Sequence, residues 1–161
     1  MRRGLQALAA VVVVSLVTVA AAMAQDGKRP PEIPAAVVQK MIELGLKNIQ
    51  RAVCDGFNPC AAATQAELKN PPITIDQARV VIIVGGRSAF AQWCGLDAER
   101  RSILPLLQSL RRSKRFDERQ LALMAVIHGI QQSLISEQLK AKGACDAATR
   151  KRFDEQLPKG P

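Results

Sequence analysis

The sequence is poor in the side chains on which many binding and catalytic sites depend. It has no tyrosine, aromatic residues make up 3% of the chain, and His128 is its one histidine. Many nucleic-acid-binding proteins stack bases on aromatic side chains, so this scarcity argues against a nucleic-acid partner despite a formal net charge of +9. A zinc site needs several converging ligands, and one histidine outside an H-E-x-x-H motif does not provide them. We therefore expect no nucleic-acid partner, no metal and no other cofactor.

Several motifs of catalysis and phosphate binding are also missing. The stretch Gly85-Gly86-Arg87-Ser88 is rich in glycine but matches neither glycine-rich phosphate-binding pattern. No C-x-x-C pair is present, which argues against a thiol oxidoreductase. Four aspartates stand where helices are expected to begin, and we interpret them as helix caps rather than as acid–base residues: Asp76, Asp97, Asp117 and Asp146.

Residues 1–24 have the pattern of a secretory signal peptide. Arg2 and Arg3 give a positive start, Leu5–Val19 is apolar, and Ala22-Met23-Ala24 has the A-x-A form of a cleavage site. The alternative is an uncleaved membrane anchor, because the apolar run approaches spanning length. The small residues that end the run favour cleavage, so we expect a periplasmic or secreted protein with no membrane span after removal of the leader.

The four cysteines of an exported chain predict two disulfides. Spacing alone leaves three pairings open, and we favour Cys54–Cys60 together with Cys94–Cys145. The first pair closes a short loop and contributes about 2 kcal/mol in the chain-entropy model. The second joins distant segments and contributes about 4 kcal/mol in the same model.

Residues 117–142 predict the central helix of a small all-α domain. Asp117 and Gln120 form a capping box at its start, and Gly143 follows Lys142 at its end. Two apolar stripes run along it, one through Leu123, Ile127, Ile130 and Leu134, the other through Leu121, Met124, His128, Ile135 and Leu139. Such a helix is nearly buried, with other helices around it. Between the stripes lies a strip of small residues: Ala122, Ala125, Gly129, Ser133 and Ser136.

The other segments complete a bundle of about five helices. The segment from Pro34 to near Cys54 predicts an amphipathic helix, in which Gly45 marks a close contact. Ala61–Leu68 has the pattern of a short helix. The helix expected at Ala98–Arg112 contains Pro105, which should kink or split it. A short helix at Ala147–Leu157 ends the fold.

The segment Ile75–Cys94 is ambiguous. Its run of Val80–Val84 has the composition of a buried strand, but Thr74 and Gln77 form a capping box and Gly95 follows as a C-cap, so we predict a helix. Its face is small around Gly85, which predicts that it crosses the small strip of the central helix.

These boundaries predict one folded domain. Residues 25–33 form a flexible lead-in, residues 34–157 the all-α domain, and residues 158–161 a disordered tail.

The basic cluster Arg111, Arg112, Lys114 and Arg115 is the exposed feature most indicative of function. It predicts a contact with an anionic protein face or with lipid headgroups, extended by Arg100, Arg101 and Arg119. The leading hypothesis is a non-enzymatic binding or accessory protein of the cell envelope.

Two alternatives belong to other classes. One is a carrier of a small apolar ligand, with a cavity beside Met124, Ile127 and Trp93. The other is an enzyme that uses His128 with Ser88, Ser133 or a free cysteine as nucleophile, which requires His128 to lie in an open cleft.

Overall fold

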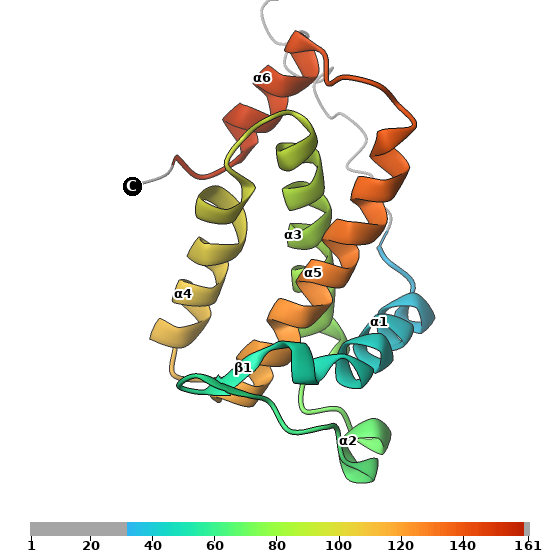
Figure 1. Ribbon diagram of the computed structural model, residues 1–161, viewed down its shortest axis with the longest axis vertical. Coiled ribbons are helices and arrows are strands. Elements are labelled where there is room, and N and C mark those ends of the chain that lie inside the picture. Colours follow the sequence, from blue (N-terminus) through green and yellow to red (C-terminus); the bar gives the residue numbers. More distant parts are fainter. Residues whose placement is uncertain (1–31, 160–161) are drawn as a thin grey trace, which may run out of the picture. The chain divides into compact units, whose positions relative to one another are not determined.

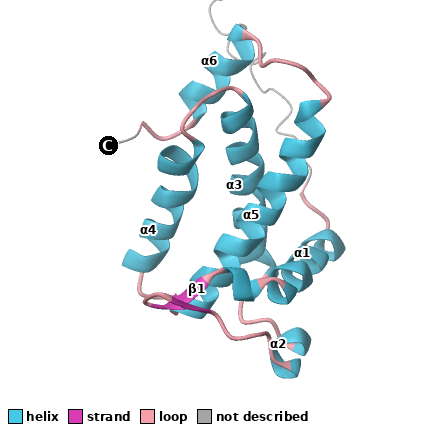
Figure 2. Cartoon of the chain, viewed as in Figure 1, coloured by secondary structure: helices cyan, strands magenta, loops and turns pink. Residues whose placement is uncertain are grey.

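The computed structural model describes residues 32–159, and within them the fold is helical with one two-stranded hairpin (Figures 1 and 2). The predicted all-α class is therefore confirmed, as are both predicted disulfides, Cys54–Cys60 and Cys94–Cys145. The predicted signal peptide lies outside the described residues. The helices of the described chain are α1 (Ala35–Lys47), α2 (Gln65–Lys69), α3 (Ile75–Trp93), α4 (Leu104–Arg112), α5 (Glu118–Lys140) and α6 (Ala147–Gln156).

Helix α5 crosses the middle of the fold, with α1 and α3 packed against it (Figure 1). The predicted capping box opens it: Gln120 N–H donates to Asp117 Oδ1 over 2.7 Å, and Asp117 N–H donates to Gln120 Oε1 over 3.0 Å. Its first half is buried almost all round, whereas Leu134 in its second half is 48% exposed. The stripe that begins at Leu123 therefore packs in the core only as far as about Ile130.

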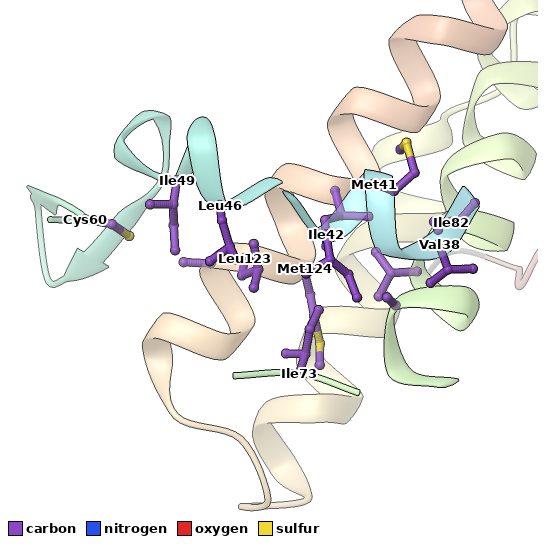
Figure 3. Packing of buried hydrophobic residues seen from close by; sticks show 14 residues of the cluster. Val38, Met41, Ile42, Leu46, Ile49, Cys60, Ile73, Ile82, Leu123 and Met124 are labelled. Atoms are coloured by element: carbon purple, nitrogen blue, oxygen red, sulfur yellow. The ribbon is translucent and has the colours of Figure 1, made fainter. Parts of the chain in front are cut away.

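The core lies between α1, α3 and the first half of α5 (Figure 3). Burial of one large aliphatic side chain is worth roughly 1.5–3 kcal/mol, so this contact region dominates the stability of the fold. Its largest fully buried side chains are Val38, Ile42, Leu46, Ile49, Val81, Leu123, Met124 and Ile127.

The ambiguous valine-rich segment is a helix, as predicted. Thr74 and Gln77 form the capping box that starts α3, with Gln77 N–H donating to Thr74 Oγ1 over 3.2 Å. The helix leaves Val80 and Ile83 about half exposed and turns Val81 and Ile82 into the core. The strand composition is overridden because the caps and the helical spacing of the buried residues agree.

Glycines let the backbones of the three main helices approach closely. A Cβ added to Gly45 of α1 would lie 2.6 Å from Ile127 Cγ1, so the predicted close contact at Gly45 is present. A Cβ added to Gly85 of α3 would lie 2.8 Å from the carbonyl oxygen of His128 in α5.

The predicted use of the small strip is wrong in one respect. Helix α3 does cross α5, but Gly85 meets the backbone at His128 and the side chain of Gln131. A Cβ on Gly129 would meet no atom within 4 Å, so the Gly129 part of the strip receives no helix of the described chain. Spacing placed the small residues on one face but did not identify which neighbour covers it.

Helix α1 is shorter than predicted. It ends at Lys47 instead of near Cys54, because Asn48 caps it and donates from Nδ2 to the carbonyl of Leu44 over 2.8 Å. A 3₁₀ turn, Ile49–Arg51, then leads into the antiparallel hairpin of β1 (Val53–Asp55) and β2 (Asn58–Pro59). Ile49 is fully buried, so the turn is anchored to the core.

The predicted Ala98–Arg112 helix is divided near Pro105 into a π-helical turn and the α-helix α4. Residues Glu99–Ile103 are π-helical, and the N–H of Leu104 donates to the carbonyl of Glu99, five residues back. Proline has no N–H and its ring crowds the carbonyl four residues earlier, which favours local widening. The predicted split is thus present as a π turn followed by α4.

Helix α6 is attached to the α3–α4 end of the molecule by a disulfide and by polar contacts. Cys145 is bonded to Cys94, and Arg150 Nη1 donates to the carbonyl of Cys94 over 2.6 Å. Arg101 Nε donates to the carbonyl of Pro158 over 2.9 Å, at the start of the predicted tail. The chain after α6 is therefore held at Pro158.

The adjacent glycines of α3 predict opposite effects of alanine. Gly85→Ala should destabilise the fold by about 1–3 kcal/mol, because the new methyl group meets backbone that must move. Gly86→Ala should stabilise it by up to about 1 kcal/mol, because its Cβ meets nothing and alanine is the better helix former. Urea unfolding of both variants measures the difference, and equal effects at the two positions would contradict the close α3–α5 contact.

Candidate binding surfaces and the buried histidine

The predicted basic cluster is exposed and forms one turn, which we call the basic turn: Arg111, Arg112, Lys114 and Arg115. Arg111 and Arg112 end α4, and Lys114 has a φ of +55°, the left-handed conformation that reverses the chain toward α5. The side chains of Arg112, Lys114 and Arg115 make no hydrogen bond or ion pair within the described chain. Three cations are thus held close together without internal partners.

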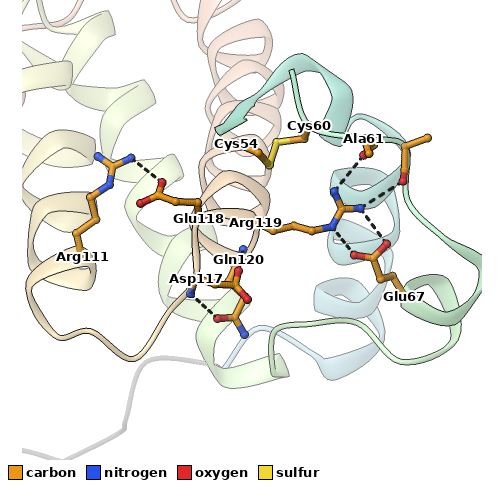
Figure 4. The surroundings of a disulfide bond; sticks show 10 residues. Cys54, Cys60, Ala61, Glu67, Arg111, Asp117, Glu118, Arg119 and Gln120 are labelled. Carbon is orange, nitrogen blue, oxygen red and sulfur yellow. Dashed lines mark hydrogen bonds and ion pairs between the residues drawn. A yellow bond between two sulfur atoms is a disulfide. The ribbon is translucent and has the colours of Figure 1, made fainter. Parts of the chain in front are cut away.

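Arg111 has the one internal ion pair of the basic turn. Its Nη2 lies 3.4 Å from Glu118 Oε2, and both side chains are more than half exposed (Figure 4). Exposed pairs of this kind contribute little, in the range of about 0–1 kcal/mol. The pair leaves the guanidinium open to an external anion.

Two of the arginines predicted to extend the basic turn have structural roles instead. Arg101 bonds Asp154 and the carbonyls at the end of α6, and Arg119 bonds Glu67. Arg100 remains 76% exposed, and its ion pair with Asp97 is long, at 3.7 Å. Sequence alone does not distinguish these roles, because the acceptors lie far away along the chain.

Arg119 and Glu67 form a bidentate clamp between α5 and α2 (Figure 4). Arg119 also donates from Nη1 to the carbonyl of Ala61 over 3.1 Å and from Nη2 to the carbonyl of Ala62 over 3.3 Å. The hydrogen bonds from Arg119 lower the pKa of Glu67 to about 2. The clamp fixes the chain that follows Cys60 to the first turn of α5.

His128 lies in a buried hydrogen-bonded chain with two serines. Ser88 Oγ is 2.8 Å from His128 Nε2 and donates to Ser102 Oγ over 2.8 Å. Ser88 comes from α3, Ser102 from the π turn, and His128 from α5. Their exposed fractions are 0%, 7% and 4%, and no fully buried side-chain nitrogen or oxygen of the described chain lacks a hydrogen-bond partner.

This arrangement gives the enzyme alternative no support. The predicted Ser88–His128 partnership is present, but a nucleophile and base must reach a substrate, and both side chains are covered. Burial also lowers the pKa of His128 to about 4, because the cationic form loses its hydration. A neutral imidazole that joins three helical segments is the simpler account.

The cavity expected for an apolar carrier is present beside Met124 only as a small apolar hollow of about 110 Å³, which Ile127 and Trp93 do not line. Met124 and Ile127 are fully packed in the core. An open hollow of about 590 Å³ lies instead beside the exposed half of α5, and we call it the outer groove. Its lining includes Arg51 and Ala52 after α1, and Ala125, Gly129, Ser133 and Leu134 of α5.

The sequence analysis did not identify two exposed side chains, Phe57 in the β1–β2 hairpin and Arg51 in the 3₁₀ turn after α1. Phe57 is 99% exposed at the tip of the hairpin that the Cys54–Cys60 disulfide closes. Arg51 is exposed at the outer groove and has no internal partner in the described chain. The exposure of Phe57 could have been predicted, because a loop closed by a disulfide between residues 6 positions apart has no core in which to bury an aromatic side chain.

Among the described residues no three acidic, cysteine or histidine side chains gather as a metal site would require. Within the same part of the chain, every helix is too short or too polar to cross a membrane. No protein-family model matches the sequence, and neither the curated proteins nor the solved structures include one that is significantly similar to it.

The buried histidine predicts a loss of stability in weak acid. The folded state keeps His128 neutral down to about pH 4, whereas the unfolded chain binds a proton near pH 6.5. Stability is therefore complete above pH 6.5 and falls by about 1.4 kcal/mol per pH unit between pH 6.5 and 4. Urea unfolding at intervals across this range should show that slope in the wild type and a nearly flat line in His128→Gln. A wild-type curve as flat as that of the variant would contradict the burial.

The Glu67–Arg119 clamp predicts a second component at lower pH. The pKa of Glu67 is lowered to about 2, so its contribution is complete above pH 4.5 and is lost between pH 4.5 and 2. Both side chains are about a quarter exposed or less, and with solvent screening we expect about 1–3 kcal/mol. Glu67→Gln should lower the free energy of unfolding at pH 6 and match the wild type near pH 2. Glu155→Gln, on an exposed residue of α6, is the control and should have no such effect.

Proposed function

We propose that the protein is an exported, non-enzymatic binding or accessory protein of the cell envelope, and that the basic turn contacts an anionic partner. The observation that supports this most directly is the absence of internal partners for Arg112, Lys114 and Arg115 within the described chain. Packing does not require three adjacent unpaired cations, which repel one another. An external anion removes that repulsion on binding.

The chemistry of the basic turn favours carboxylate or phosphate groups. Arginine presents a planar fork of donors that matches either group in a bidentate manner, and the turn offers three arginines with one lysine. An acidic protein face and an anionic lipid headgroup both carry such groups. Because all four side chains are exposed, the contact is expected to weaken with salt.

The predicted location of the protein agrees with this proposal. Two disulfides are compatible with an extracellular or periplasmic protein, because such bonds persist in oxidising compartments. The predicted signal peptide would deliver the chain there. In that location the accessible anions are lipid headgroups and the acidic faces of envelope proteins.

Neutralising the three unpaired cations should weaken binding without weakening the fold. The variant is Arg112→Gln, Lys114→Asn and Arg115→Gln, in which asparagine tolerates the left-handed conformation of position 114. Binding to vesicles that contain phosphatidylglycerol, and to delipidated envelope proteins, is measured at low and high salt. We expect a loss of about tenfold or more in one of these two arms, because each surface cation is worth about 1 kcal/mol against an anionic membrane. The melting temperature should not change.

A matched control separates the basic turn from net charge. Lys40→Gln, Lys69→Gln and Lys142→Gln remove the same charge from exposed positions elsewhere. An equal loss of binding in the control would show that only the total charge matters. A lowered melting temperature with unchanged binding would assign the basic turn a structural role.

A further inference from the structure

We propose that the outer groove binds a long-chain anionic amphiphile, with its apolar chain along α5 and its head beside Arg51. The groove is separate from the basic turn, which ends α4 before α5 begins and contributes no residue to the groove lining. Its volume of about 590 Å³ is within the range of small-molecule sites, about 300–1,000 Å³. No segment of the described chain fills it.

The α5 side of the groove offers an apolar surface that the fold does not use. Leu134 is 48% exposed there although it continues the apolar stripe of the core. Val126 and Ile130 lie beside it and are only partly buried. Covering these side chains with a hydrocarbon chain removes apolar surface from water, which is favourable.

Gly129 adds room that the protein's own packing does not need. Gly45 and Gly85 each sit where a Cβ would collide with a neighbouring helix, whereas a Cβ on Gly129 meets nothing within 4 Å. A glycine inside a helix costs about 1 kcal/mol relative to alanine. Gly86 shares this lack of a contact within the described chain, but Gly129 lines the outer groove, where the missing side chain leaves space between Ala125 and Ser133.

The charges around the groove select the head group. Arg51 is exposed in the lining and has no internal partner in the described chain. The one carboxylate of the lining, Glu137, is paired with Lys140, whose Nζ lies 2.6 Å from its Oε1. Glu137 and Lys140 offset each other's charge, so Arg51 makes the net charge beside the groove positive, and an anionic head is complementary to it.

Calorimetric titration of the exported, oxidised protein with laurate tests the proposal below the micellar range. Dodecyltrimethylammonium has the same chain with a cationic head, and butyrate has the anionic head without the long chain. We expect laurate to bind more tightly than either. Absence of laurate binding, or equal binding of the cationic amphiphile, would overturn the proposal.

Two pairs of variants locate the site. Gly129→Leu fills the groove and should lower laurate affinity by about tenfold or more, whereas Gly86→Leu, at a helical glycine with the same open space, should not. Arg51→Gln should weaken laurate binding several-fold but leave that of neutral dodecanol unchanged. Arg87→Gln removes an exposed cation outside the groove and should change neither.

The remaining outcomes are also decisive. If Gly129→Leu lowers the melting temperature, Ser133→Leu, at an exposed position of the same groove, replaces it as the filling variant. Unchanged laurate affinity in a folded filling variant would place the ligand elsewhere. A protein that is dimeric by light scattering, and becomes monomeric in the filling variant, would show that a second copy occupies the groove instead of an amphiphile.

Discussion

The close approach of α3 to α5 at Gly85 is the contact on which the rest of the structure depends. A side chain at position 85 would collide with the His128 carbonyl, and without that approach Ser88 would not reach the imidazole. Ser102 joins the same hydrogen-bonded chain from the π turn, so this contact also positions the segment that continues into α4. The basic turn at the end of α4 is thus placed by this buried polar chain together with Leu106 and Leu110 of α4, which pack against the core while remaining partly exposed.

Much of the fold was predictable because local signals agreed with the tertiary contacts. The capping boxes at Thr74 and Asp117, and the two disulfides, are in the structure as the sequence predicts them. One error concerns partners that are distant in sequence, and another concerns a local helix end. The face of α5 that contains Gly129 has the spacing of a helix contact, yet spacing does not reveal which neighbour covers a face, and no described segment covers this one. The early end of α1 depends on the side chain of Asn48, whose capping bond is a weak signal within an amphipathic pattern.

The arginines divide into two groups by the number of acceptors around them. Arg119 faces a carboxylate and two backbone carbonyls, and Arg101 faces a carboxylate and the carbonyls that end α6. Both bring together segments more than fifty residues apart, and they add to the apolar contacts between the same segments. The cations of the basic turn, by contrast, have one exposed carboxylate among them. The formal charge of +9 therefore overstates what is available to a partner, and the position of the unpaired cations is more informative than their number.

The helical glycines also divide into those whose contacts within the fold explain them and those without such contacts, and Gly129 of the outer groove belongs to the second group. Gly45 and Gly85 lose helix propensity but allow two helix contacts, so their presence is explained by the folded chain. Gly86 and Gly129 have the same intrinsic cost without such a contact, and of these two Gly129 lines the outer groove, where Leu134 also remains in water. A helix that is apolar on a face which its own domain leaves uncovered is stabilised when another molecule covers that face. Because Lys140 offsets the charge of Glu137 and Arg51 has no partner in the described chain, the net charge beside the groove is positive and favours an anionic occupant.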